Sequence, residues 1–130
     1  MTPTPITVRA GETLTAAMEL MAMKRIRHLP VVDQAGKLIG LVTDRDLRRA
    51  APSPFSSGNA SQDHAKMDQI SVEKIMVRSP STISPDHRLQ DVLKVMVEKK
   101  YGALPVLEHD KLVGIITPID VMRSWLKDAP

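Results

Sequence analysis

The chain has 130 residues, of which 42% are hydrophobic and 25% charged, a composition that fits a folded globular protein and argues against wholesale disorder. It contains no cysteine, which excludes disulfide bonds, thiolate metal sites and cysteine nucleophiles. The formal net charge of +3 is mild and aromatic residues are few, so a basic, base-stacking surface for nucleic acid is not expected.

The first predicted element is a short strand over residues 6–8, directly after a proline. A helix follows, in which Thr13 can act as the N-cap and which should continue through Lys24. Apolar side chains recur in it at helical spacing and predict one buried face: Leu14, Ala17, Met18 and Met21.

An apolar run over residues 29–32 predicts a buried strand, and residues 33–36 have the composition of a tight turn. Residues 38–42 then predict the second strand of a hairpin. Thr43 stands at the end of this strand, where a helix beginning near Asp44 would leave its first N–H groups without backbone partners. The first half of the chain therefore predicts the order β-α-β-β-α.

A Pro- and Ser-rich stretch over residues 51–61 predicts a loop between the two halves. Residues 71–76 are typical of a short capped helical turn that enters the second half. The expected organisation is a first repeat over 1–50, a linker over 51–70 and a second repeat over 71–130.

The second half repeats the first at a shift of 75 residues, which becomes 74 after a one-residue deletion in the hairpin loop. Pro118 stands where a proline in the first turn of a helix costs nothing. The order β-α-β-β-α is therefore expected twice. Met1 falls on Met76 at this shift, so the first repeat lacks counterparts of residues 71–75. Either the chain was shortened there or the natural chain starts abruptly.

The repeated pattern resembles the cystathionine-β-synthase (CBS) domain. The resemblance is carried by Leu29-Pro30-Val31 with the Gly-x-x-Thr-x-x-Asp motif of residues 40–46, and by Leu104-Pro105-Val106 with the same motif at residues 114–120. Residues 26–33 together with the first motif are also similar to stand-alone CBS pairs of the acetoin-utilisation protein B type. The resemblance implies an α/β (α+β) fold in which two β-α-β-β-α repeats, related by a pseudo-two-fold axis, form one Bateman module.

The resemblance further implies clefts between the repeats that hold an adenosine-containing ligand such as AMP, ADP or ATP, and a regulatory role. Asp46 and Asp120 would accept hydrogen bonds from the two ribose hydroxyls, and Thr43 and Thr117 would donate to a phosphate. The remaining residues expected to line the base and the phosphate approach are Thr4, Pro5, Ile6, Pro30, Ser79, Ser81, Thr82 and Pro105.

The two expected sites are not equivalent. The first repeat has Arg27-His28 before its strand proline and Arg45 inside its motif, and these groups suit a phosphate. The second has Gly102-Ala103 and Ile119 at the same positions, which leave room for a base. His28 can also titrate near neutral pH. In a purely structural alternative the motif residues only cap helices, and the two arginines form surface ion pairs with Glu12, Asp33 or Asp44.

Two helices of the second repeat carry more apolar surface than one sheet needs, which predicts a homodimer through the helices containing Val92, Met96, Met122 and Trp125. The chain has no nucleophile motif, no paired catalytic carboxylates and no Walker-type loop, so no enzyme activity, required cofactor or metal site is expected.

No apolar run approaches the length of a membrane span, and the start of the chain does not resemble a signal peptide. A cytoplasmic protein without a membrane partner is therefore expected. Two other functions stay open. The chain could be a dimerisation or scaffold module with empty clefts, or a sensor of S-adenosylmethionine or an NAD-type ligand.

Overall fold

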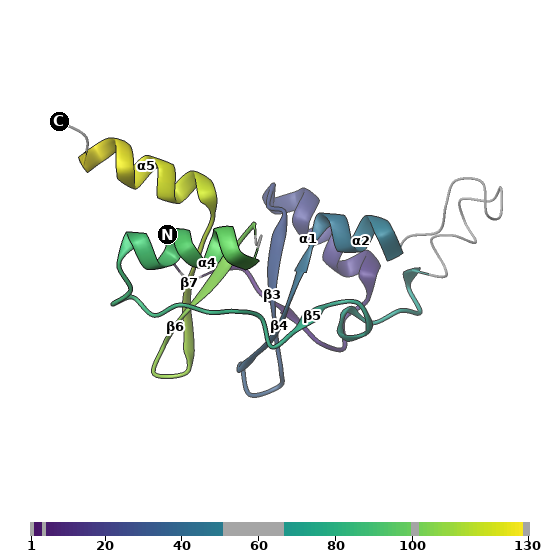
Figure 1. Cartoon of the computed structure of the whole chain (residues 1–130). Helices are drawn as coiled ribbons and strands as arrows, with labels where there is room; N and C mark the ends of the chain where they lie inside the picture. Colours follow the sequence, from purple (N-terminus) through teal and green to yellow (C-terminus); the bar gives the residue numbers. More distant parts are fainter. Residues whose placement is uncertain (1, 4, 51–66, 100–101, 129–130) are drawn as a thin grey trace. The chain divides into compact units, whose positions relative to one another are not determined.

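The computed structural model describes residues 2–3, 5–50, 67–99 and 102–128 (Figure 1). The chain forms two compact units. Unit 1 joins Met1–Pro5 to Pro80–Pro130, and unit 2 comprises Ile6–Ser79. The loop predicted over residues 51–61 lies outside the described residues. No helix in the described ranges is both long and apolar enough to cross a membrane.

Unit 2 is built on a four-stranded sheet with its helices packed against β3 and β4. In sheet order, its strands are β2 (Val8–Arg9), β3 (His28–Val32), β4 (Leu38–Thr43) and β5 (Val77–Arg78). β2 is parallel to β3, and the other neighbours are antiparallel. The helical elements whose bounds lie in the described ranges are α1 (Leu14–Lys24), α2 (Asp44–Ala50) and the short 3-10 helix η1 (Val72–Lys74).

Local sequence signals explain the start and the end of α1. The Thr13 Oγ1 accepts a hydrogen bond from the Ala16 N–H at 3.1 Å, so the predicted N-cap is confirmed. The helix ends at Lys24, and the left-handed conformation of Arg25, with a φ of 54°, lets the N–H of Ile26 donate to the Met21 carbonyl at 3.0 Å. The predicted turn is also confirmed, because Asp33 Oδ1 accepts from the backbone N–H groups of Ala35 and Lys37.

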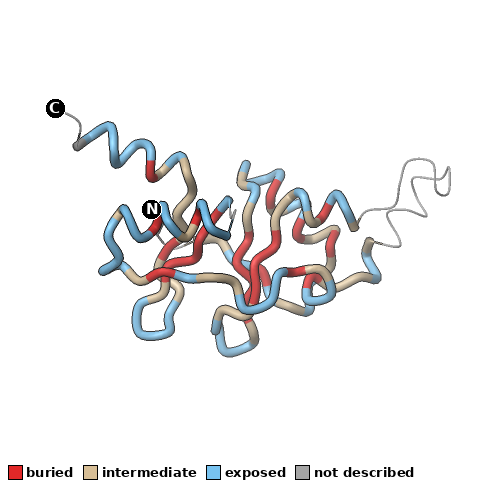
Figure 2. Tube along the Cα trace, in the orientation of Figure 1, coloured by how far each residue is buried: buried red, intermediate tan, exposed pale blue. Residues whose placement is uncertain are grey.

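Buried aliphatic side chains from both helices and three strands form the core of unit 2, drawn in red in Figure 2. Three of the four residues predicted for the buried face of α1, Leu14, Ala17 and Met21, lie in this core. The fourth, Met18, is an exposed side chain, because its position on the helix turns it away from the sheet. η1 adds Val72, and Met76 follows it into the core.

Unit 1 has a three-stranded sheet and a smaller core. In sheet order, its strands are β1 (Thr2–Pro3), β7 (Lys111–Ile116) and β6 (Leu104–Glu108), and its helices are α4 (Leu89–Lys99) and α5 (Pro118–Asp128). Ile83 forms a parallel bridge with Val106. The core contains Ile83, Val92, Met96, Leu104, Val106 and Val121.

Each sheet contains a short strand that comes from the neighbourhood of the other repeat. β5 lies near the start of the second repeat, yet it pairs with β4 of the first, with Val77 opposite Leu41. β1 lies at the start of the first repeat, yet it pairs with β7 of the second, with Thr2 opposite Ile115. The shift of 75 maps β1 onto β5, so the exchange is reciprocal. Strands of two residues are too short to show a periodic pattern, which is why the sequence did not predict them.

Gly40 lies where β4 passes Met76 and β5. A Cβ placed on this glycine would lie 2.8 Å from the Met76 Cγ and 3.1 Å from the Val77 carbonyl oxygen. Met76 is buried in the core and Val77 is bonded into the sheet, so neither has room to move. The glycine in the motif of the first repeat therefore permits the attachment of β5.

We expect Gly40→Ala to reduce the free energy of unfolding by about 1–3 kcal/mol, because the added methyl overpacks the site where β5 joins the sheet. Urea unfolding followed by far-UV circular dichroism measures the effect. Gly11→Ala is the matched control, since nothing lies within 4 Å of a Cβ at that position. Equal stabilities of the two variants would contradict the close passage of Met76 and β5 over Gly40.

Candidate functional site

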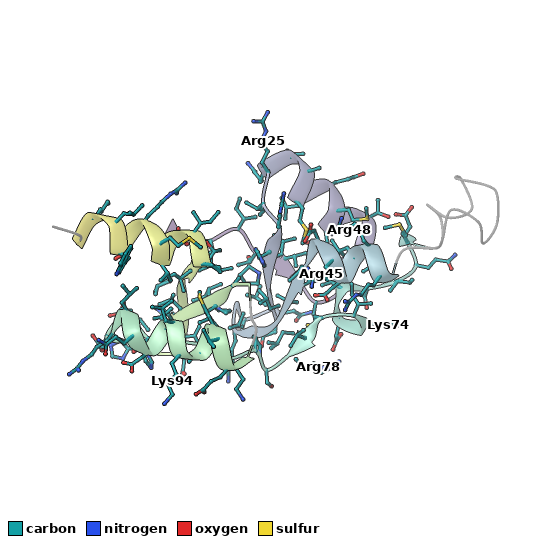
Figure 3. All side chains as sticks on the ribbon, turned by 45° about the horizontal axis from the view of Figure 1, so that its top comes forward. Arg25, Arg45, Arg48, Lys74, Arg78 and Lys94 are labelled. Atoms are coloured by element: carbon teal, nitrogen blue, oxygen red, sulfur yellow. The ribbon has the colours of Figure 1, made fainter. Side chains whose placement is uncertain are left out.

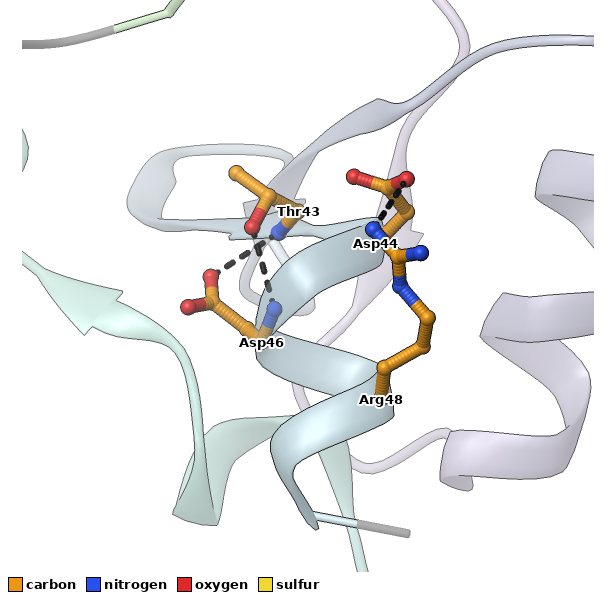
Figure 4. A network of polar contacts seen from close by, with 4 residues as sticks. All are labelled: Thr43, Asp44, Asp46 and Arg48. Carbon is orange, nitrogen blue, oxygen red and sulfur yellow. Dashed lines mark hydrogen bonds and ion pairs between the residues drawn. The ribbon is translucent and has the colours of Figure 1, made fainter.

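The Thr-x-x-Asp motif of the first repeat connects the end of β4 to the first turn of α2 (Figure 4). The Thr43 N–H donates to Asp46 Oδ2 at 3.0 Å, and the Asp46 N–H donates to Thr43 Oγ1 at 3.1 Å. Each side chain satisfies a backbone group of the other residue, as in a capping box. The helix cap considered as the structural alternative is therefore present in the chain.

The motif of the second repeat occupies the corresponding position at the start of α5, but its threonine hydroxyl is bonded differently. The Thr117 N–H donates to Asp120 Oδ2 at 2.9 Å, and the Thr117 hydroxyl donates to the same oxygen at 3.2 Å. In both repeats the hydrogen bonds formed among the described residues engage only Oδ2 of the aspartate. Because the two carboxylates are partly exposed, Oδ1 of each can still accept from a ligand.

His28 is a titratable residue of β3 that lies opposite Thr43 in the pairing of β3 with β4. Burial lowers the pKa of its imidazole below the usual 6.5, and the positive charge of Arg27 lowers it further. The carboxylates of Asp44 and Asp46 act in the opposite direction and raise the pKa. The net shift is downward, so at pH 7 the imidazole is neutral and one of its ring nitrogens can accept a hydrogen bond.

The ion pairs near the motif differ from those expected. Arg48 pairs with Asp44 at 3.2 Å, one helical turn away on α2. Figure 3 shows Arg45 and Arg48 on this helix. Within the described ranges, ion pairs join only Arg48 to Asp44 and Arg78 to Glu73. The predicted surface pairs of Arg27 and Arg45 with Glu12, Asp33 or Asp44 are therefore absent from this part of the chain.

Arg27 and Arg45 nevertheless lie near the motif. The Asp44 N–H donates to the Arg27 carbonyl at 2.9 Å, which ties the residue before β3 to the start of α2. Both arginine side chains are exposed. In unit 2 the structure therefore brings Arg27, His28, Thr43, Arg45 and Asp46 to one end of the sheet.

Unit 1 gathers a corresponding set at the end of its sheet. The Ile83 N–H donates to the Pro105 carbonyl at 3.1 Å, and this segment runs parallel to β6. Ser81 and Thr82 precede Ile83 and therefore lie at the end of the sheet where β6 begins. At that same end β7 finishes beside Leu104 and leads to Thr117. The other expected residues at this end are Gly102, Ala103, Ile119 and Asp120.

Three expected residues occupy other positions in their units. The Ser79 N–H donates to the Ile39 carbonyl at 3.2 Å, near the start of β4, whereas Thr43 ends that strand. Pro5 follows β1, which runs away from Thr117 along β7. Ile6 is partly buried against the core of unit 2. Thr4 lies outside the described residues.

The strand prolines have a structural role in this fold. The rings of Pro30 and Pro105 are fully buried, and the two residues pair with Leu41 and Ile115 in their hairpins. Their contribution to a site would therefore be a missing N–H donor rather than an exposed ring.

Asp44 and Arg48 were not among the expected site residues, although an acid and a base four residues apart on a helix could have indicated their pairing.

No group of three or more His, Asp or Glu side chains in the described ranges is placed to hold a metal ion. The polar atoms near the two motifs are hydroxyl, carboxylate, imidazole and, in unit 2, guanidinium groups. Such groups hydrogen-bond sugars and phosphates. Among the residues that the structure describes, these groups do not form an arrangement of nucleophile, base and oxyanion donors.

Sequence comparison agrees with this arrangement. The sequence model of the CBS domain matches residues 1–53 and 72–127. The chain is 34% identical over 128 residues to a CBS domain-containing protein of Dictyostelium discoideum, and the match covers 98% of this chain and 88% of that protein. It covers only 22% of the inosine-5′-monophosphate dehydrogenase of Aquifex aeolicus, to which it is 29% identical. The matching part is a minor share of that enzyme.

Solved structures show the same fold. CBSX2 of Arabidopsis thaliana in complex with AMP superposes with a TM-score of 0.79 at 29% identity, covering 98% of this chain and 93% of that one. The acetoin utilization protein AcuB of Vibrio cholerae gives 0.76 at 31% identity, with coverages of 98% and 87%. The CBS pair of protein MJ0100 with 5′-methylthioadenosine and S-adenosyl-L-methionine gives 0.77 at 26% identity, with coverages of 96% and 90%.

These matches confirm the α/β (α+β) fold that the resemblance implied, including its similarity to acetoin-utilisation protein B. The two motifs and the two hairpins with their helices correspond to two copies of one domain. The chain belongs to the CBS domain family and is a CBS pair with the Bateman-module fold.

Proposed function

We propose that the chain is a non-catalytic regulatory module of the cytoplasm that binds an adenosine-containing ligand of the AMP, ADP or ATP type and signals its occupancy to a partner protein. One observation carries the proposal. Each repeat holds an aspartate whose Oδ2 is bonded by a threonine while Oδ1 can still accept a hydrogen bond from a ribose hydroxyl. The structures of CBSX2 with AMP and of MJ0100 with adenosyl compounds support this choice of ligand class.

The groups around the first motif favour a phosphorylated ligand. Arg27 and Arg45 are exposed cations without an ion pair in the described ranges, so a phosphate could bind them without displacing a carboxylate. The Thr43 hydroxyl accepts from the Asp46 N–H and keeps its own proton to donate. Among the other expected residues of unit 2, Ser79 lies near the start of β4, at the opposite end of that strand from Thr43, so only a part of the ligand that extends beyond the motif would reach it.

The groups around the second motif favour an uncharged part of a ligand. Ile119 and Gly102 replace the cations of the first repeat, and the Thr117 hydroxyl already donates its proton to Asp120. S-adenosylmethionine is therefore a second candidate ligand, because it carries no phosphate and the related MJ0100 pair was solved with it.

The proposal includes self-association through α4 and α5, the helices that contain Val92, Met96, Met122 and Trp125. Val92 and Met96 are buried in the core of unit 1 and cannot form the contact themselves. The exposed apolar residues of the same helices, among them Met122 and Trp125, support it.

A panel of AMP, ADP, ATP, adenosine, S-adenosylmethionine and reduced NAD tests the ligand class by thermal shift. We expect an adenine nucleotide to raise the melting temperature as its concentration rises, since a ligand at 100 times its Kd stabilises the native state by about 2.7 kcal/mol. A larger effect of S-adenosylmethionine would favour the second candidate. If no compound in the panel shifts the melting temperature, the result favours the scaffold function.

Asp46→Asn and Asp120→Asn should each weaken binding at one site by roughly 10-fold or more, because a hydrogen bond to a charged acceptor is worth about 1.5–3 kcal/mol. Isothermal titration calorimetry measures the affinity and the number of sites. Asn retains an oxygen for the helix cap, so the fold should survive. Asp91→Asn is the matched control, since Asp91 accepts from the Arg88 N–H at 3.2 Å at the start of α4. Unchanged affinity in both site variants would refute the ribose contact.

His28 makes the stability of unit 2 depend on pH. Its folded-state pKa is lowered below 6.5, so protonation favours the unfolded chain. The contribution of the neutral imidazole to the free energy of unfolding is fully present above about pH 6.5 and decreases as the pH falls below it. His28→Gln should flatten the slope of the free energy of unfolding against pH, measured by urea unfolding between pH 5 and 7.5. His109→Asn, which removes an exposed imidazole, should retain it. A slope unaffected by His28→Gln would exclude this residue as the cause.

A further inference from the structure

Unit 2 has an open cavity of about 400 Å³ beside the hairpin that connects β3 to β4 (Figure 1). This volume falls within the range of small-molecule sites. The hairpin leads into the start of β4, whereas Thr43 ends that strand, so the cavity and the first motif lie at opposite ends of the sheet. The residues whose side chains bear on its chemistry are Arg9, Glu12, Asp33, Thr7, Val32 and Ala35.

Two backbone turns give the cavity its shape. In the turn after β2, the Glu12 N–H donates to the Arg9 carbonyl at 3.0 Å. The turn after β3 is held by Oδ1 of Asp33, which accepts two backbone N–H groups at 2.9 Å. The Ala10 N–H donates to the Val32 carbonyl at 3.1 Å and joins the two turns. The charged side chains therefore stand on ordered backbone, which lowers the entropic cost of binding a ligand between them.

The three charged side chains of the cavity form no ion pair with any residue that the structure describes. Arg9 and Glu12 are exposed. The N–H of Glu73 donates to the turn after β2 at 3.1 Å, but its carboxylate pairs with Arg78 instead of Arg9. Oδ1 of Asp33 is used by its own turn, and no described residue donates a hydrogen bond to Oδ2. The cavity thus presents one guanidinium and two carboxylates to a ligand.

We propose that this cavity binds a free basic amino acid such as lysine or arginine. At pH 7 such a molecule carries one carboxylate and two cationic groups, the reverse of the charges in the lining. The Arg9 guanidinium suits the ligand carboxylate, which it can bind through two parallel hydrogen bonds. Glu12 and Asp33 accept hydrogen bonds from the two cations, and the aliphatic part of the ligand lies against Val32 and Ala35.

The charge pattern also selects against related molecules. A neutral amino acid has one cation, so it leaves one of the two carboxylates without a partner. A diamine has no carboxylate, so it leaves Arg9 without a partner and brings a cation close to it. Specificity of this kind comes from the groups that the wrong ligand leaves unpaired.

The inference goes beyond the proposed adenosine function and does not depend on it. None of the residues that line the cavity was expected to contact the adenosine ligand, and Asp46 does not line it. A chain that binds a nucleotide but not lysine would overturn the present inference alone. A chain that binds lysine but not a nucleotide would overturn the adenosine proposal alone.

Isothermal titration calorimetry of the whole chain with L-lysine, L-norleucine and cadaverine tests the charge pattern. Norleucine lacks the second amine of lysine, and cadaverine lacks its carboxylate. We expect lysine to bind at one site and each analogue to bind at least about 10-fold more weakly, because each loses a hydrogen bond between charged groups. Absence of binding at millimolar lysine, or equal binding of all three compounds, would overturn the inference.

Two variants assign the contacts. Glu12→Gln should bring the affinity for lysine down to that for norleucine, because one carboxylate then serves two cations. Arg9→Gln should remove the preference for lysine over cadaverine. Both residues are exposed, so the fold should persist, and circular dichroism checks this. Glu19→Gln, at an exposed residue of α1 outside the cavity, and Asp46→Asn should both retain the wild-type preferences. Preferences that survive Glu12→Gln and Arg9→Gln would place the lysine site elsewhere and overturn the assignment to this cavity.

Discussion

The attachment of β5 to β4 beside Gly40 is the contact on which unit 2 depends. Two residues of strand offer few hydrogen bonds, so their position is held by the buried Met76 and by the absence of a side chain on Gly40. In unit 1, β1 pairs antiparallel with β7, with Pro3 opposite Gly114. Because each sheet includes a strand from outside its own repeat, neither repeat by itself contains all the strands of a unit. The chain is therefore anchored to unit 2 through β5, directly before it continues into unit 1 at Pro80.

The two Thr-x-x-Asp motifs show how a helix cap and a ligand site can share the same atoms. A cap needs one carboxylate oxygen, and the bond to the threonine also fixes the direction of the second oxygen. Folding has then already ordered the side chain that a ribose would meet, which reduces the entropic cost of binding. The hydroxyls differ, since Thr43 accepts from a backbone N–H and Thr117 donates to the carboxylate.

The two repeats share the order of their hairpins and helices but differ in the side chains on their surfaces. Where α2 carries Arg45 and Arg48, α5 carries Ile119 and Met122. We infer that this one exchange serves both parts of the proposed function, since cations suit an anionic ligand at the first motif and apolar residues suit a second copy at unit 1. His28 belongs to the polar side of this division, because the charges that shift its pKa all lie near the first motif.

Sequence alone determined the features that depend on neighbouring residues. The cap at Thr13, the turn at Asp33 and the hairpins follow from local hydrogen bonding and from apolar spacing, so they were predictable. The repeat also located both motifs, through matched residue types at a constant shift. Which apolar residues of α4 are buried could not be predicted, because Val92 and Leu93 have the same character and only the position of the sheet distinguishes them. The exchange of β1 and β5 likewise required the tertiary structure, because pairing between residues distant in sequence leaves no periodic signal in two-residue strands.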